Sequence, residues 1–200
     1  MLLQKSKILK LVEDGELIIR PLLENEQINE TAIDFRLGYD FLVSVQSREP
    51  FINASLNNFK HKPLTSFFQE TRRKIGDTFM LYPNQTVLAT SLEFIKLPNN
   101  VLAELNMRSS YARLGITIST ILQPGYCGCI SLELTNTNIN PINLTVGARL
   151  FQARLTLLDE PSNYFENPRK YICQVRPEAS AANFDSDLHK LNKIWLENNV

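Results

Sequence analysis

The sequence has no excess of charge of either sign and no long hydrophobic run. Lysine and arginine together number 21, and so do aspartate and glutamate, so the overall charge offers nothing to hold a nucleic acid polymer. No stretch approaches the roughly 18 consecutive apolar residues of a membrane helix, and the first ten residues, MLLQKSKILK, lack the long apolar segment of a secretion signal. We therefore expect no nucleic acid polymer or membrane as partner, and a cytoplasmic location.

Cysteine is also scarce. The three cysteines, Cys127, Cys129 and Cys173, are an odd number in a chain of this size. That number suits a reducing compartment better than a disulfide framework. We expect the three thiols to serve in packing.

Short apolar or alternating segments, separated by Pro, Asn and Gly, dominate the chain. With 200 residues, of which 44% are hydrophobic, they can form one domain with a proper core. Many short strands with frequent turns favour a β-sandwich or β-barrel. The predicted strands lie in AIDFRLG (32–38), TFMLYP (78–83), TVLATSLEFIKLP (86–98), GCISLELTN (128–136), INLTVG (142–147) and ARLFQARLTLL (148–158).

Three parts of the chain depart from the strand pattern. Near the start, Ser6 is a candidate cap for a short amphipathic helix that ends at Gly15 and has an apolar face of Ile8, Leu11 and Val12. Residues 46–76, with two prolines and two basic clusters, are predicted to be a long surface excursion. Residues 181–200 are predicted to be a helical extension, because helical spacing follows two possible caps: Asp185, Ser186, Leu188, Leu191 and Trp195.

The stretch MRSSYARLG (107–115) gathers two arginines and two serines between apolar neighbours. Arg108 and Arg113 can pair with phosphate or carboxylate, and Ser109 and Ser110 can donate hydroxyl hydrogen bonds. From these residues alone, the stretch is either a solvated turn or a site for an anion.

Glu133 lies in the predicted strand at 128–136. Strict alternation places Ile130, Leu132 and Leu134 on one face, and Glu133 on the other face with Cys129, Ser131 and Thr135. That face is either the solvent side of a half-buried sheet or the wall of a pocket. In a pocket, burial would raise the carboxyl pKa and suit proton transfer near neutral pH.

A turn, LQPGYCG, leads into this strand. Its glycines, Gly125 and Gly128, allow a ligand to approach the backbone closely, and Tyr126 offers a ring on which a base or sugar could rest.

Together these segments resemble a known family. MRSSYARLGI, QPGYCGCISLELTN and NPINLTVGARLFQARL, in this order, are similar to the signature region of the dCTP deaminases, which share a fold with the trimeric dUTPases. The resemblance extends to ILKLVEDGELIIRP, INETAIDFRLGYDFLV, the stretch from FMLYPNQ to NMRSS, and KYICQVRPEAS. It covers most of residues 1–180, apart from 46–76.

The resemblance implies a mainly β, dUTPase-like subunit: a distorted β-barrel, or β-clip, with a short N-terminal helix and a C-terminal helix. Residues 1–180 would form this domain. Three copies would assemble into a homotrimer with sites between subunits, and the reaction would be the hydrolytic deamination of dCTP to dUTP and ammonia.

The resemblance also implies roles for individual residues. Glu133 would be the general base and acid, and Ser109 and Arg113 would position the water and the carboxylate. Arg108 and Ser110 would bind phosphate. Magnesium would arrive on the triphosphate, held mainly by phosphate oxygens and water. Base and triphosphate contacts would come from a closing carboxy-terminal segment through Tyr164, Lys170 and Gln174.

No zinc is expected. Zinc deaminases need His-x-Glu together with Pro-Cys-x-x-Cys. Here His61 is followed by Lys62 and Pro63, and PGYCGC has a different cysteine spacing.

One segment departs from the family pattern. Between Arg113 and Glu133 the family has a longer loop with an Ile-Asp-Pro-Gly element, whose aspartate serves the sugar hydroxyl. This chain has Gln123 at that position, which can hydrogen-bond only as a neutral partner. In dUTPases that aspartate activates the water, so we rank dUTPase or bifunctional activity below deaminase. A trimer that binds nucleotide as a signal without turnover is the alternative of another class.

Overall fold

The computed structural model describes residues 1–55, 62–118, 120–162, 164–166, 169–184, 193–195 and 197. The chain divides into two compact units. The first comprises Met1–Val43 and Glu70–Glu178, and the second comprises Ser44–Gln69 and Ala179–Val200. Every predicted site residue belongs to the first unit.

The elements of the chain are mostly strands. In chain order they are α1 (Lys5–Glu13), β1 (Ile18–Arg20), η1 (Asn25–Gln27), β2 (Ile33–Ser44), η2 (Leu64–Phe67), β3 (Phe68–Arg72), β4 (Thr78–Leu81), β5 (Thr86–Lys96), β6 (Val101–Met107), α2 (Ser109–Ala112), β7 (Ile116–Thr117), β8 (Ile121–Leu122), β9 (Cys127–Asn136), β10 (Ile142–Thr145), β11 (Arg149–Leu157) and η3 (Ala182–Phe184).

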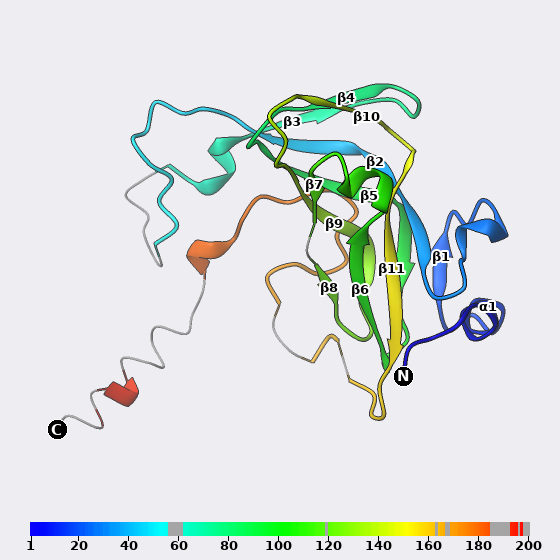
Figure 1. Cartoon of the computed structure of the whole chain (residues 1–200). Coiled ribbons are helices and arrows are strands. Elements are labelled where there is room, and N and C mark those ends of the chain that lie inside the picture. Colours follow the sequence, from blue (N-terminus) through cyan, green and yellow to red (C-terminus); the bar gives the residue numbers. More distant parts are fainter. Residues whose placement is uncertain are drawn as a thin grey trace. The chain divides into compact units, whose positions relative to one another are not determined.

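Helix α1 confirms the predicted N-terminal helix but corrects its start. The N-cap is Gln4, which makes no side-chain capping hydrogen bond, so Ser6 lies inside the helix and the predicted cap was wrong. Ile8 is the buried residue of its apolar face, and Gly15 follows the last turn as predicted. The helix lies beside β1 at one side of the sheet (Figure 1).

All six predicted strand segments contain strands, which confirms the mainly β class. Their alternating or continuous apolar residues are buried on the core side. The sequence missed β3, which falls inside the stretch 46–76 and pairs with β2. It also missed β1 and β6, and the two-residue strands β7 and β8, which are too short to show a period.

The nine-stranded sheet follows the order β7-β9-β5-β2-β11-β6-β8, with β1 added to β5 and β3 to β2. Strands β2, β11 and β6 run side by side in Figure 1. Strands β7 and β8 lie at opposite ends of this order, yet only residues 118–120 separate them in the chain. Because so few residues span at most about 14 Å, the sheet must curl until its two ends meet.

The interior of this curled sheet is a continuous hydrophobic core. Phe35 of β2 stacks on Phe151 of β11 with ring centroids 5.6 Å apart, and Phe41 stacks on Phe79 at 4.1 Å. Leucine, isoleucine and valine side chains from β5, β6, β9 and β11 complete the core. The core therefore fixes which face of β9 points outward.

The second unit contains the 3-10 turn η2, in which Leu64 and Phe67 are buried. Residues 193–195 and 197 are helical, whereas Asp185, Ser186, Leu188 and Leu191 lie outside the described residues. The helical extension over 181–200 stays a prediction.

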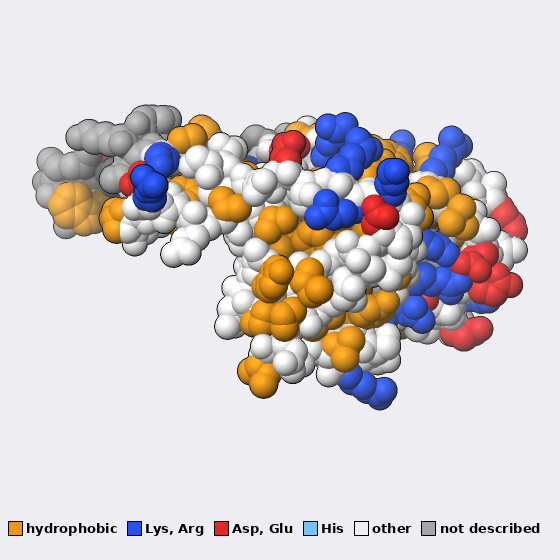
Figure 2. Space-filling model, turned by 90° about the horizontal axis from the view of Figure 1, so that it is seen from above, with side chains coloured by type: hydrophobic (Ala, Val, Ile, Leu, Met, Phe, Trp, Pro, Cys, Tyr) orange, Lys and Arg blue, Asp and Glu red, His pale blue; other side chains and the backbone are white. Residues whose placement is uncertain are grey.

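Charged side chains of both signs are mixed with hydrophobic patches on the face seen in Figure 2. Within the described part of the chain, no helix combines the length and the apolar character needed to cross a membrane.

Candidate active site

Glu133 projects from the outer face of β9. Ile130, Leu132 and Leu134 are 0%, 1% and 0% exposed, while Glu133 is exposed, so the predicted alternation is confirmed. The Thr120 hydroxyl donates a hydrogen bond to Oε2 of Glu133 at 3.0 Å. The Thr120 carbonyl accepts a hydrogen bond from the Leu105 amide of β6 at 3.0 Å. Thr120 thus joins the two ends of the curled sheet and holds the carboxylate where they meet.

A cavity of about 200 Å³ opens beside this carboxylate. Its walls come from the turn after β7, from β8, from β9 and from the carboxy-terminal segment. It contains five predicted site residues: Gln123, Tyr126, Glu133, Tyr164 and Gln174. The other lining residues are Thr120, Ile121, Leu122, Ser131, Arg169, Tyr171 and Cys173. Glu133 therefore lines a pocket while its side chain stays exposed to solvent.

Two tyrosines form the apolar wall of the pocket. The edge of one ring faces the other, with the centroids of Tyr126 and Tyr164 at 5.9 Å. The Tyr126 hydroxyl donates to the Cys129 carbonyl at 2.7 Å, and burial raises its pKa. Burial also raises the pKa of Tyr164, so both phenols stay neutral. The Arg169 guanidinium lies over the Tyr164 ring, 4.2 Å from its centre, in a cation–π contact.

The two glycines of the turn, Gly125 and Gly128, allow the carboxy-terminal segment of the same chain to pack closely against the backbone of the turn. A Cβ on Gly128 would come within 2.7 Å of the Gln174 carbonyl oxygen, and one on Gly125 within 2.9 Å of the Tyr164 Cβ. The Gln174 carbonyl accepts a hydrogen bond from the Cys129 amide at 2.7 Å, and its side-chain Oε1 accepts one from Ser131 at 2.6 Å. The predicted close approach is real, but the partner is the carboxy-terminal segment.

The arginine and serine stretch forms helix α2, a single turn with Arg108 as its N-cap. Ser109, Ser110 and Arg113 are exposed, and within the described residues their side chains have no hydrogen-bond or ion-pair partner. Arg108 is half-buried. It donates to the Arg149 carbonyl at 3.2 Å, and its Nε lies 3.5 Å from Asp34 Oδ2. Two nitrogens of its guanidinium, Nη1 and Nε, therefore have partners, while the side chain stays 39% exposed.

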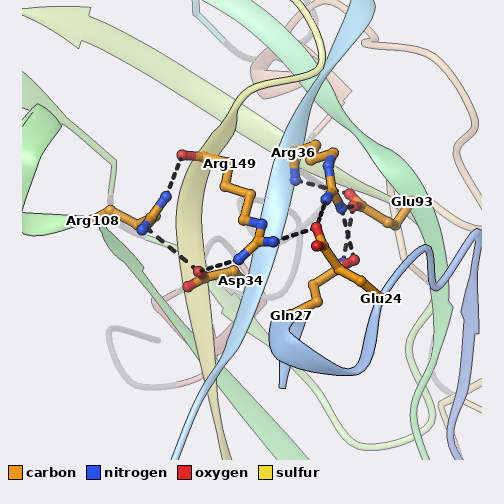
Figure 3. A network of polar contacts seen from close by, with 7 residues as sticks. All are labelled: Glu24, Gln27, Asp34, Arg36, Glu93, Arg108 and Arg149. Carbon is orange, nitrogen blue, oxygen red and sulfur yellow. Dashed lines mark hydrogen bonds and ion pairs between the residues drawn. The ribbon is translucent and has the colours of Figure 1, made fainter. Parts of the chain in front are cut away.

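Arg108 is one end of a polar network that crosses the sheet (Figure 3). Asp34 pairs with both Arg108 and Arg149, and Arg149 continues to Glu24. Glu24 also accepts from Arg36 at 2.5 Å. The hydrogen bond from Arg149 lowers the pKa of Glu24, with Arg36 adding to the effect.

The other end of the network is buried. Arg36 contacts Glu93 through Nη1 at 3.2 Å, and its backbone amide donates to Glu93 Oε2 at 2.9 Å. Gln27 donates to Glu93 Oε1 at 3.0 Å and accepts from Arg36 at 2.7 Å. Burial raises the pKa of Glu93, against the opposing effect of Arg36. A continuous chain of charges therefore connects the core to Arg108.

A single chain does not assemble all the predicted site residues. Five line the Glu133 pocket, and four lie on or next to α2. Within the described residues, Arg113 makes no ion pair with Glu133. Lys170 is exposed and does not line the pocket, whereas the neighbouring Arg169 does.

The sequence missed Thr120, Arg169 and Ser131 as pocket residues. Ser131 had a signal, because it shares the strand face of Glu133. Thr120 and Arg169 had none, since their positions depend on the closure of the sheet and on the path of the carboxy-terminal segment.

Comparison with known proteins decides the family. The sequence model of a protein family described as dCTP deaminase-like matches residues 2–158 of this chain. The chain belongs to the dCTP deaminase-like family. This confirms the resemblance noted in the sequence.

Several relatives of this dCTP deaminase-like chain match it over almost its full length. The "dCTP deaminase, dUMP-forming" of Methanobrevibacter smithii is 30% identical over 94% of this chain and 99% of its own length. The "dCTP deaminase" of Halorubrum lacusprofundi is 34% identical over 94% of this chain and 95% of its own. The "dCTP deaminase, dUMP-forming" of Persephonella marina is 35% identical over 94% and 100%.

One solved structure supports the fold of this dCTP deaminase-like chain. The 2′-deoxycytidine 5′-triphosphate deaminase of Agrobacterium tumefaciens superposes with a TM-score of 0.59 at 22% identity. The match covers 78% of this chain, which spans about half (47%) of that solved chain.

Proposed function

We propose that this protein hydrolyses dCTP to dUTP and ammonia. The observation that carries the proposal is the position of Glu133: an exposed carboxylate, hydrogen-bonded by Thr120, on the wall of a pocket lined by Tyr126 and Tyr164. The names of the relatives support deamination of dCTP, although those of Methanobrevibacter smithii and Persephonella marina are named dUMP-forming.

Glu133 would act without zinc as both base and acid. Its carboxylate accepts a proton from a water molecule as the oxygen attacks C4 of the cytosine, and passes that proton to the ring nitrogen. Glu133 then takes the proton of the C4 hydroxyl as the C4 carbonyl forms and delivers it to the exocyclic nitrogen, so that the bond between C4 and this nitrogen breaks and ammonia leaves. Because Thr120 occupies only one carboxylate oxygen, Oε1 is available to the water.

The phosphates would bind to Arg108 and Ser110. Magnesium would enter on the triphosphate and neutralise part of its charge. Asp34, the carboxylate closest along the network to Arg108, is already paired with two arginines, so we assign the ion's ligands to phosphate oxygens and water. A cytoplasmic location stays a prediction.

We further propose a homotrimer whose sites combine two subunits. In one chain, Ser109 and Arg113 have no partner among the described residues, and Glu133 has no cation paired with it. An assembly that brings α2 of one copy to the Glu133 pocket of another would complete the site. Light scattering coupled to size-exclusion chromatography would give the mass of three chains.

The test of the proposed function is a nucleotide panel assayed for ammonia and pyrophosphate together. With magnesium, dCTP is expected to yield equal amounts of ammonia and dUTP. No pyrophosphate is expected, because Gln123 cannot serve as the carboxylate base of a dUTPase. Two of the relatives named above are dUMP-forming, so pyrophosphate release would show the bifunctional reaction. Tight dCTP binding with neither product would favour the nucleotide-sensing alternative.

The two arginines of the α2 region are expected to differ in their kinetic effects. Arg108→Gln should raise KM for dCTP about tenfold with little change in kcat, because it removes a phosphate partner. Arg113→Gln should lower kcat about tenfold or more with a smaller effect on KM, because it removes the cation that positions the carboxylate. Steady-state kinetics measures both.

Arg154→Gln, an exposed arginine on β11, is the control and should change neither parameter. Equal effects of Arg108→Gln and Arg113→Gln on the same parameter would contradict the division of roles.

A further inference from the structure

Two of the three cysteines lie together where the carboxy-terminal segment meets β9. Cys127 is the first residue of β9, and the nearby Cys173 thiol helps to raise the pKa of its thiol. The backbone independently places Cys173 beside Gly128, the residue that follows Cys127. A Cβ on Gly128 would lie 3.3 Å from the Cys173 carbonyl carbon, and the Cys129 amide bonds to the Gln174 carbonyl.

The environments of these thiols differ. Cys173 is exposed, so the expectation that it serves in packing was wrong. Its φ of 49° lies in the left-handed region that residues other than glycine seldom adopt. Cys127 is partly buried, and burial together with the Cys173 thiol raises its pKa, while Lys96 opposes that rise. An oxidant in solution therefore reaches Cys173 first.

The pair adjoins the Glu133 pocket. Cys173 lines that pocket, and the next residue, Gln174, is bonded to Ser131 on the Glu133 face of β9. A covalent bond at Cys173 would fix this wall of the pocket to the strand. A wall that must move for a ligand to enter or leave limits turnover when it is held.

We propose that Cys127 and Cys173 form a reversible disulfide that fastens the carboxy-terminal segment to β9 and slows nucleotide exchange. The effect on turnover rests on the proposed function, whereas the disulfide itself does not.

Hydrogen peroxide is a sufficient oxidant. The Cys173 thiolate attacks one peroxide oxygen, and the O–O bond breaks to give a sulfenic acid and, after protonation, water. Cys127 then attacks the sulfenic sulfur, the S–S bond forms, and a second water leaves. Two thiols and one peroxide thus become one disulfide and two waters, and a small dithiol such as dithiothreitol reverses the change.

The experiment uses the full chain, reduced and then treated with hydrogen peroxide. Peptide mapping by mass spectrometry is expected to find a Cys127–Cys173 bond in the wild type and in Cys129→Ser, with a loss of two hydrogens from the intact mass. Cys127→Ser should form no such bond. Oxidation is expected to lower dCTP turnover about tenfold in the wild type and in Cys129→Ser, and dithiothreitol should restore it.

Cys127→Ser distinguishes the effect of the disulfide from general oxidative damage. Because it cannot form the Cys127–Cys173 bond, it should keep most of its turnover after oxidation. A disulfide that includes Cys129, or oxidation of Cys173 to sulfinic acid without a bond, would overturn the proposal. Unchanged turnover despite a Cys127–Cys173 bond, or an equal loss of turnover in Cys127→Ser, would overturn the effect on the pocket. Reduced wild type without any deaminase activity would instead contradict the proposed function, and the peptide map would still decide the disulfide.

Discussion

Glu133→Gln is expected to abolish deamination while leaving dCTP bound. Glutamine keeps the size of the side chain and can still accept a hydrogen bond from Thr120, so the pocket should keep its form. It cannot take the proton from water, and general acid–base catalysis is typically worth about 10² to 10⁴-fold in rate. We therefore expect kcat to fall by that factor, measured as ammonia release, with the dCTP dissociation constant changed by less than about threefold.

A matched control is Glu16→Gln, which changes an exposed carboxylate between α1 and β1 and should leave kcat as it is. If Glu133→Gln kept more than about a tenth of the wild-type rate, a proton-transfer role worth 10²-fold or more would be untenable. If it failed to bind dCTP, its far-ultraviolet circular dichroism and thermal midpoint would show whether the fold had been lost instead.

Local pattern was sufficient to predict most strands and the orientation of Glu133. An antiparallel strand packed on one side requires a period of two, and β9 keeps that period from Cys129 to Thr135 without interruption. The same rule could not reveal that the outer face lines a pocket. That depends on β7 and β8 meeting around Thr120, and their pairings with β9 and β6 are set by the whole sheet order.

Contacts between distant parts of the chain explain what the sequence did not reveal. Arg36 is 57 residues from Glu93, and Arg108 is 41 residues from Arg149. No periodicity encodes such pairs. At Gly128 the sequence predicted a close approach to the backbone by a ligand. The structure shows a close approach, but the group that approaches is the backbone of Gln174.

Among the substitutions proposed for this protein, replacement of Arg36 is expected to lower the free energy of unfolding most. Arg36→Met would remove the charge partner of Glu93, whose side chain is inaccessible to solvent, and one of two partners of Glu24. Leaving one member of a buried ion pair without its partner typically costs about 3–5 kcal/mol. For a chain of this length that corresponds to a drop in thermal midpoint of about 6–20 °C. Urea denaturation followed by circular dichroism measures the free energy of unfolding directly.

The pH dependence of this loss identifies its cause. Removing Arg36 raises the pKa of Glu93 further, so the folded variant favours a neutral Glu93 and loses stability as pH rises through that higher pKa. Glu24 has a lowered pKa in the wild type, and the stability it contributes is present above its unfolded pKa and is lost as pH falls. Both groups make the loss of unfolding free energy in Arg36→Met largest at neutral pH and smaller toward pH 4.

Arg154→Met, which changes an exposed arginine on β11, should have an unfolding free energy within about 0.5 kcal/mol of the wild type. Replacing both partners, as in Arg36→Met with Glu93→Leu, should recover part of the loss because the unpaired charge of Glu93 is removed as well. If the loss of unfolding free energy in Arg36→Met did not depend on pH, its cause would be lost packing around Arg36. The missing cation beside the buried Glu93 carboxylate would then not be the cause.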